Sequence, residues 1–189
     1  MIAGLKAVQI AEQQHLRDLI ASGLITDYSL ALDGGAHLGG WTVIMAEHFS
    51  RVVAIEPSEA IDQLRANCAD LPNVMVVHAA LMAKPGRAVC VSKLNRALTS
   101  RRFVPGASGQ VDAITIDSLE LDQCGLLKLD IEGGELAALH GARQTIARFW
   151  PFILCEMAGF PHDAEAKALL LRLGYRQVFE RGVDKGFAK

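Results

Sequence analysis

The sequence lacks the features that mark several large classes of protein. Its four cysteines form no C-x-x-C pair, which argues against a zinc or redox motif and indicates buried thiols in a reducing compartment. Its longest strongly apolar runs, such as residues 149–155, are far shorter than a membrane span. A net charge of −2 provides no general attraction to nucleic acid or anionic lipid. We therefore expect no membrane or nucleic-acid partner.

The first residues also lack the pattern of a secretory signal. No basic segment followed by a long apolar one is present, and Glu12, Arg17 and Asp18 interrupt the early apolar residues. Together with the unpaired cysteines, this predicts a cytoplasmic protein.

What the chain does contain is an alternation of helical and strand patterns. Its 189 residues, 51% of them hydrophobic, are enough for one domain over residues 1–189, with a helical lead-in over 1–27. The alternation predicts an α/β fold with a doubly wound, mostly parallel sheet and helices on both faces. A polar loop insertion is expected over 93–110. Helices are expected over 5–22, 41–49, 58–71, 134–149 and 163–173, and strands over 28–32, 51–55, 74–77, 88–92, 112–116, 126–131, 152–157 and 175–180.

A glycine-rich segment follows the first strand and precedes a helix, as in nucleotide-binding folds. Its spacing is not the G-x-G-x-x-G of a dinucleotide site, which argues against an NAD-dependent oxidoreductase. The acid that ends the first strand, Asp33, suits a cationic ligand group and would oppose a pyrophosphate. The acid that ends the second, Glu56, can accept both hydroxyls of a ribose. These features favour S-adenosylmethionine; a tight structural turn and a helix cap are the alternative interpretation.

The chain resembles the FkbM family of methyltransferases over residues 31 to about 157. The resemblance rests on the segments 32–39, 54–58, 64–67, 78–81, 115–119, 128–135 and 151–156, of which Lys-x-Asp-x-Glu-Gly-x-Glu at 128–135 is the most specific. It implies a class I, Rossmann-like methyltransferase fold, S-adenosylmethionine as cofactor, and O-methylation of a hydroxyl on a sugar or other small metabolite.

The resemblance also implies a set of cofactor-binding residues. The methionine part is expected against the glycine segment, the ribose against Glu56, and the adenine beside His78 and Ala79. The family usually has Asn where this chain has His37. The full set expected to bind the cofactor is Asp33, Gly34, Gly35, Ala36, His37, Gly39, Glu56, Pro57, His78 and Ala79.

Three acids follow two neighbouring strands and are the candidate catalytic residues. A regular strand would place Lys128, Asp130 and Glu132 on one side, with Asp130 and Glu132 at its carboxyl end. Asp130 is the first candidate for an acid–base or positioning group, and Glu132 the second. Glu156 is a candidate base, metal ligand or partner of Lys128, and an ion pair with Lys128 is the alternative for Asp130. No dedicated metal motif is present, so a divalent metal is the weaker hypothesis.

The acceptor itself is not encoded by a motif. Arg101 and Arg102, in the predicted 93–110 loop, are candidates to contact an anionic acceptor, although a solvated basic loop is the default interpretation. The expected partner is a small-molecule acceptor. The sequence does not decide whether a second subunit closes the site, as it would in a homodimer. A non-catalytic domain that binds S-adenosylmethionine or a nucleoside is the competing function. The segment after residue 129 does not resemble the Asn-Pro-Pro-Tyr of base methyltransferases, which disfavours nucleic acid as substrate.

Overall fold

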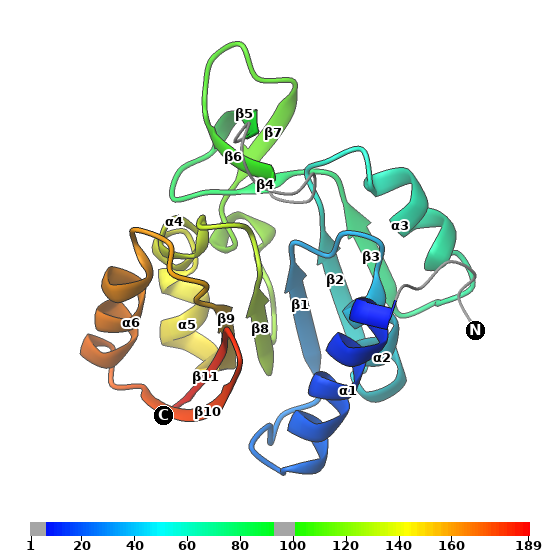
Figure 1. The fold of residues 1–189 in the computed structure, drawn as a ribbon, viewed down its shortest axis with the longest axis vertical. Coiled ribbons are helices and arrows are strands. Elements are labelled where there is room, and N and C mark those ends of the chain that lie inside the picture. Colours follow the sequence, from blue (N-terminus) through cyan, green and yellow to red (C-terminus); the bar gives the residue numbers. More distant parts are fainter. Residues whose placement is uncertain (1–6, 93–100) are drawn as a thin grey trace.

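The computed structural model describes residues 7–92 and 101–189, which form a seven-stranded sheet and a smaller four-stranded sheet (Figure 1). The strands of the main sheet lie in the order β10-β11-β9-β8-β1-β2-β3. All are parallel except β11, which is antiparallel to both neighbours. They span β1 (Leu30–Gly34), β2 (Arg51–Ile55), β3 (Val74–Val77), β8 (Leu126–Leu129), β9 (Phe152–Glu156), β10 (Arg176–Arg181) and β11 (Asp184–Ala188). The predicted α/β fold with a mostly parallel sheet is confirmed.

The strand order reverses between β1 and β8. In open α/β sheets, the loops after the two strands on either side of such a reversal diverge and leave a crevice at the carboxyl edge. The carboxyl ends of the central strands coincide, since Gly34 pairs with both Ile55 and Leu129, and Leu129 with Cys155. Residues that follow β1, β2, β8 and β9 therefore meet at one edge.

Helices cover both faces of the main sheet. On one face, Leu16 of α1 and Ile44 of α2 share an apolar cluster with Val52 of β2. On the other, Leu139 of α4 and Leu170 of α6 pack with residues of the central strands. The helices are α1 (Ala7–Ala21), α2 (Gly40–His48) and α3 (Ile61–Asn67), then α4 (Glu135–His140), α5 (Arg143–Phe149) and α6 (Asp163–Arg172). Within the described ranges, no helix is long and apolar enough to cross a membrane.

The single helix predicted over 134–149 is wrong, because the chain breaks into α4 and α5. A Cβ atom on Gly141 would lie 2.2 Å from the carbonyl oxygen of Met82, so the backbone there passes against another segment. The carboxylate of Asp117, in the short 3-10 helix η1 (Asp117–Leu119), accepts hydrogen bonds from the backbone N–H groups of Gln144 and Thr145. These bonds satisfy free donors at the start of α5 and allow a new helix to begin.

Residues 101–105, predicted as part of a polar loop, instead form a strand of the smaller sheet. This sheet has the order β4-β7-β5-β6 and lies beyond one end of the main sheet (Figure 1). Its β6 pairs antiparallel with β5, and Phe103 packs against a small apolar cluster that includes Ala88 and Ala113. Residues 93–100 lie outside the described residues. The strands are β4 (Ala80–Leu81), β5 (Gly86–Ser92), β6 (Arg101–Pro105) and β7 (Val111–Ile114).

Candidate functional site

The glycine segment after β1 is held tightly between its two neighbouring strands. The N–H groups of Gly35 and Ala36 both donate to the carbonyl oxygen of Ile55, at 2.9 and 3.1 Å. Gly35 has a φ of +79°, and a Cβ atom there would lie 1.8 Å from the carbonyl oxygen of Asp130. Only glycine fits this position. The segment thus fixes the distance between the ends of β2 and β8, where the predicted cofactor and catalytic residues lie.

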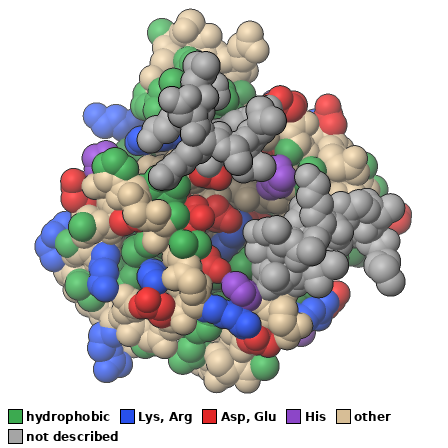
Figure 2. Space-filling model, in the orientation of Figure 1, with side chains coloured by type: hydrophobic (Ala, Val, Ile, Leu, Met, Phe, Trp, Pro, Cys, Tyr) green, Lys and Arg blue, Asp and Glu red, His purple; other side chains and the backbone are tan. Residues whose placement is uncertain are grey.

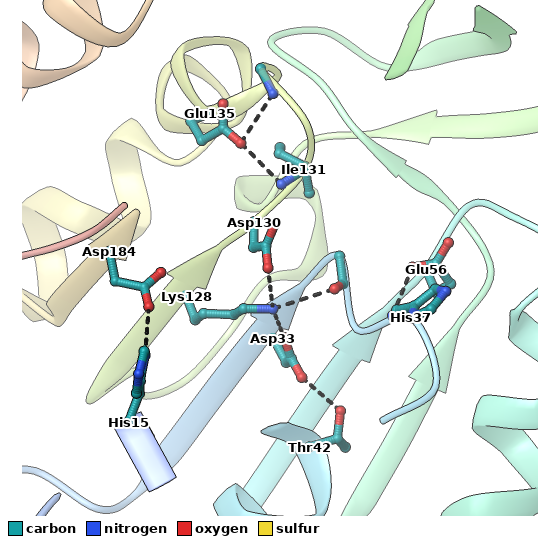
Figure 3. Close-up of polar contacts among 12 residues, drawn as sticks. His15, Asp33, His37, Thr42, Glu56, Lys128, Asp130, Ile131, Glu135 and Asp184 are labelled. Atoms are coloured by element: carbon teal, nitrogen blue, oxygen red, sulfur yellow. Dashed lines mark hydrogen bonds and ion pairs between the residues drawn. The ribbon is translucent and has the colours of Figure 1, made fainter. Parts of the chain in front are cut away.

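A buried lysine joins the glycine segment to the candidate catalytic acid (Figure 3). The Nζ atom of Lys128 lies 2.8 Å from Oδ1 of Asp33, 3.3 Å from the carbonyl oxygen of Gly35 and 3.7 Å from Oδ2 of Asp130. The hydroxyl of Thr42 donates to Oδ2 of Asp33 at 2.7 Å. Burial alone would lower the pKa of Lys128, but the Asp33 and Asp130 carboxylates outweigh it and hold the pKa above its ordinary value. The ammonium is therefore charged.

Asp33 lies beneath the glycine segment and is not exposed to solvent. Its side chain is 0% exposed, and both carboxylate oxygens accept hydrogen bonds from protein groups. Its direct contact with the cofactor stays a prediction. Asp33 has a structural role, because its carboxylate accepts hydrogen bonds both from Lys128 and from Thr42 in the first turn of α2.

Glu56 follows β2 and has its carboxylate oriented by the backbone. Its Oε2 atom accepts a hydrogen bond from the N–H of His37, and its Oε1 atom from the N–H of Ser58, each at 2.8 Å. The residue is 6% exposed. Beside it, Nε2 of His78 lies 3.1 Å from the carbonyl oxygen of Pro57. Each carboxylate oxygen has a lone pair left for a ligand, so the arrangement fits a pair of ribose hydroxyls.

Other predicted cofactor residues lie on the same edge. Ala36 and Ala79 are buried, and Gly39 takes a φ of +87° immediately before α2. His37 has a φ of 50°, the left-handed conformation that asparagine tolerates well. The donor set of this edge is rich in carboxylates, which suits a sulfonium and an ammonium better than a pyrophosphate.

The loop after β8 does not continue the strand as predicted. The strand ends at Leu129, and Glu132 and Gly133 have φ values of 57° and 88°. Regular alternation of Lys128, Asp130 and Glu132 on one side is therefore wrong beyond Asp130. The turn is stabilised by Glu135, which the sequence analysis did not include in the site.

Glu135 is 2% exposed and holds the turn through one carboxylate oxygen. Its Oε1 atom accepts hydrogen bonds from the N–H groups of Ile131 and Gly133, at 2.9 and 3.3 Å (Figure 3). Burial raises the pKa of Glu135 to about 7, although these backbone hydrogen bonds lower it. The sequence feature that could have indicated this role is an acid directly after two glycines, at the start of a helix. Such an acid can accept hydrogen bonds from the N–H groups of the turn before it.

Glu156, at the end of β9, is a carboxyl group that favours its neutral form. Burial raises its pKa well above the ordinary value, and the nearby Asp130 and Glu132 carboxylates raise it further. Its Oε2 atom is buried and has no hydrogen-bond partner among the residues that the structure describes. Asp130, in contrast, has 41% of its side chain exposed. Both residues are half-buried, and the side chains of Glu156 and Asp130 form a hydrogen bond with each other.

A cavity of about 240 Å³ lies beside these acids. Its walls include His15, Trp41, Asp130, Glu156, Arg181 and Asp184. Figure 2 shows acidic side chains gathered in a hollow at the centre of this face. His15 and Asp184 were missed by the sequence analysis. Asp184 enters the site because β11 pairs it with Glu156, and its Oδ2 atom lies 3.4 Å from Nδ1 of His15 (Figure 3).

The arginines predicted to contact an acceptor lie on β6 of the smaller sheet. The side chain of Arg101 lies outside the described residues. The Nε atom of Arg102 is buried and has no hydrogen-bond partner in the described part of the chain. Their contact with an anionic acceptor stays a prediction. Across residues 7–92 and 101–189, no three His, Cys, Asp or Glu side chains are grouped as ligands of a metal ion.

A sheet of this order, with a glycine loop after β1 and an acid after β2, defines the class I fold of S-adenosylmethionine-dependent methyltransferases. Within that class, the chain belongs to the methyltransferase FkbM domain family, whose model matches residues 33–177. This confirms the resemblance seen in the sequence. No curated protein matches the sequence at a significant level.

Solved structures share the fold at low sequence identity. One is a methyltransferase FkbM from Methylobacillus flagellatus KT, with 22% identity and a TM-score of 0.60 over 89% of this chain. The present chain spans only 46% of that protein. A second is a SAM-dependent methyltransferase from Leishmania major, with 15% identity, a TM-score of 0.55, and coverage of 98% and 74% of the two chains. A third is a candidate methyltransferase from Streptococcus mutans in complex with SAH, with 11% identity, a TM-score of 0.52, and coverage of 93% and 95%.

Proposed function

We propose that this chain binds S-adenosylmethionine at the carboxyl edge of its main sheet and transfers the methyl group to a hydroxyl oxygen of a small acceptor. The observation that carries the proposal is Glu56, whose two carboxylate oxygens are oriented by backbone N–H groups beside the glycine segment. Membership of the FkbM family and the Streptococcus mutans relative solved with SAH support this cofactor.

Different residues of this edge bind different parts of the cofactor. Glu56 accepts hydrogen bonds from the ribose hydroxyls, and His78 and Ala79 lie beside the adenine. The methionine part lies along the segment from Gly34 to Gly39, with its charged sulfonium toward the acids after β8 and β9. When bound, the cofactor would supply an activated methyl group: a C–O bond to the acceptor would form as the C–S bond breaks and SAH leaves. The chain contributes alignment of that oxygen, which lowers the barrier by several kcal/mol in comparable reactions, about 7 or more where fit is good.

The acids after β8 and β9 take different parts in removing the hydroxyl proton. Asp130 lines the cavity, and its Oδ2 atom lies 3.7 Å from Nζ of the charged Lys128. It is the group that accepts the proton of the acceptor. Glu156 is held neutral by burial, so it can donate a hydrogen bond that orients the acceptor. Glu132, on the strained turn, is the second candidate for positioning.

Calorimetric titration of S-adenosylmethionine tests the cofactor site. We expect Glu56→Ala to weaken binding by about 1.5–3 kcal/mol, the usual contribution of a charge-assisted hydrogen bond. Glu56→Gln, which keeps one acceptor oxygen, should lose less. Glu47→Ala, which removes an exposed carboxylate from α2, is the control and should bind as the wild type does.

The outcomes separate the hypotheses. Wild-type protein that fails to bind S-adenosylmethionine, or binds it equally after Glu56→Ala, contradicts the cofactor site. Tight binding without transfer of a labelled methyl group to any of a broad panel of hydroxyl compounds would favour the non-catalytic alternative.

A further inference from the structure

The cavity beside Asp130 is built largely by segments that flank the family domain. The family model covers residues 33–177, which include Trp41, Asp130 and Glu156. The opposite wall comes from His15 on α1 and from Arg181 and Asp184 at the turn between β10 and β11, all outside that range. Acceptor selection is expected where a fold varies, because function resides in sites added to a shared scaffold.

The cations near the cavity are already committed to other acids. Lys128 is paired with Asp33 at 2.8 Å. Arg181 forms an ion pair with Asp18 of α1. His15 contacts Asp184 through Nδ1, at 3.4 Å, and carries charge only when protonated. Each of these cations is therefore already paired with an acid among the residues that the structure describes.

Three acids line the cavity: Asp130, Glu156 and Asp184. Burial favours the neutral form of Glu156 and raises its pKa. Burial raises the pKa of Asp184, and the negative charge of Asp130 raises it further, whereas His15 and Lys128 lower it. The charged Lys128 near both carboxylates offsets part of their mutual repulsion, and a cation bound in the cavity would offset more of it.

Trp41 adds an aromatic face to the same wall. The Nζ atom of Lys128 lies 5.6 Å from the centre of its ring. Aromatic faces attract cations and also pack against the C–H faces of small ring compounds. A volume of about 240 Å³ holds one small polar molecule. The wall therefore combines carboxylates, an imidazole and an indole.

We propose that this cavity is the acceptor site, and that it selects a polyhydroxy compound carrying a protonated amine, with Asp184 as the residue that recognises the amine. The assignment rests on the proposed function, because it places the acceptor beside the cofactor edge. Asp184 acts in specificity: it binds the ammonium and aligns the hydroxyl with Asp130. His15 positions the Asp184 carboxylate through Nδ1–H.

The test uses three sugars of one ring size that differ in charge. Protein saturated with SAH is titrated calorimetrically with D-glucosamine, D-glucose and D-glucuronate at near-neutral pH, where most of the amine is protonated and carboxylates are favoured over carboxylic acids. We expect glucosamine to bind about tenfold more tightly than glucose, as a charge-assisted hydrogen bond predicts, and glucuronate to bind most weakly. Asp184→Asn should abolish the preference for glucosamine and leave the affinity for SAH unchanged.

Asp122→Asn is the matched control, because it removes the same charge from an exposed acid paired with Arg51 at the opposite end of β2. It should keep the glucosamine preference. Thermal unfolding shows whether Asp184→Asn has folded, and the three wild-type titrations decide the charge preference without any variant.

Several results would overturn the assignment. Equal or stronger binding of glucuronate would support the role predicted for Arg101 and Arg102 instead. A preference for glucosamine that survives Asp184→Asn, or no glucosamine binding at all, would also exclude it. Weaker SAH binding in Asp184→Asn would assign the cavity to the methionine part of the cofactor. In each case SAH binding to wild type would leave the proposed methyltransferase function intact, whereas its absence would remove both.

Discussion

The ammonium of Lys128 lies 2.8 Å from a carboxylate oxygen of Asp33, and both side chains are almost completely buried. These residues belong to β8 and β1, the two strands between which the strand order reverses. One buried ion pair therefore joins the strand that carries Asp130 to the strand that leads into the glycine segment. The glycine segment and the candidate catalytic acid are therefore held at a fixed distance from each other.

Replacing one member of this pair should destabilise the protein strongly. Lys128→Met leaves Asp33 buried without its cation, and we expect a loss of about 3–5 kcal/mol in the free energy of unfolding. The double variant Lys128→Met/Asp33→Asn should lose clearly less than the sum of the single losses, by about 1 kcal/mol or more. Urea denaturation measures all four proteins. Additive losses would show that the two side chains are not energetically coupled.

The close approach at Gly35 predicts a contrast between two glycines of similar φ. Gly35→Ala would bring a Cβ atom within 1.8 Å of the Asp130 carbonyl oxygen, and we expect a loss of more than about 3 kcal/mol. Gly23 has a φ of +71°, and a Cβ atom added there would meet no atom within 4 Å. Gly23→Ala should therefore lower the free energy of unfolding only by the backbone strain, about 1–2 kcal/mol. Thermal unfolding compares the two. Equal losses would contradict the packing of the glycine segment against β8.

Glu135 should make stability fall as the pH rises. Its pKa is about 7 in the folded protein and near its ordinary value in the unfolded chain. Between about pH 4.5 and 7 the folded state thus binds more protons, and stability is lost across this window. Glu135→Gln keeps an oxygen acceptor for Ile131 and Gly133 and removes the titration.

The difference between the wild-type and Glu135→Gln stability curves isolates this group. We expect the variant to gain on the order of 2 kcal/mol relative to wild type from pH 5 to pH 8. Urea denaturation at several pH values gives the curves. Curves that run parallel would mean that Glu135 keeps an ordinary pKa in the folded protein.

The backbone of His37 predicts the effect of two substitutions. Its φ of 50° suits asparagine, so His37→Asn should raise stability slightly, by about 0.5 kcal/mol, whereas His37→Val should lower it by about 1–2 kcal/mol. The contact with Glu56 is made by the backbone N–H, so S-adenosylmethionine affinity should be kept in the asparagine variant. A large loss of affinity in His37→Asn would instead indicate that the imidazole binds the cofactor.

The parts of the fold that were predictable are those with local signals. The strands over 51–55 and 74–77 have the predicted bounds, because each is a short apolar run between turn residues. The break between α4 and α5 was not predictable, because it depends on Met82 and Asp117, which meet Gly141 and Thr145 only in three dimensions. Strand β6 was not predicted, because its two arginines, its proline and the glycines that follow it are typical of a polar loop.

The candidate site divides in the same way. Glu56 and Asp130 could be located because each directly follows a strand, and parallel strands bring such positions to one edge. His15 and Asp184 could not, since 169 residues separate them and they meet only because β11 lies antiparallel between β10 and β9. The environment of Asp33 was also beyond the sequence, which shows an acid before glycines but not the buried lysine that pairs with it.

A crystal structure of the protein in complex with SAH tests the central claim most directly. We predict density for the ribose hydroxyls against the Glu56 carboxylate, with the sulfur directed toward Asp130 and the cavity between His15 and Asp184 left free for an acceptor. A nucleoside bound away from Glu56, or a homocysteine tail that fills the cavity, would contradict the account.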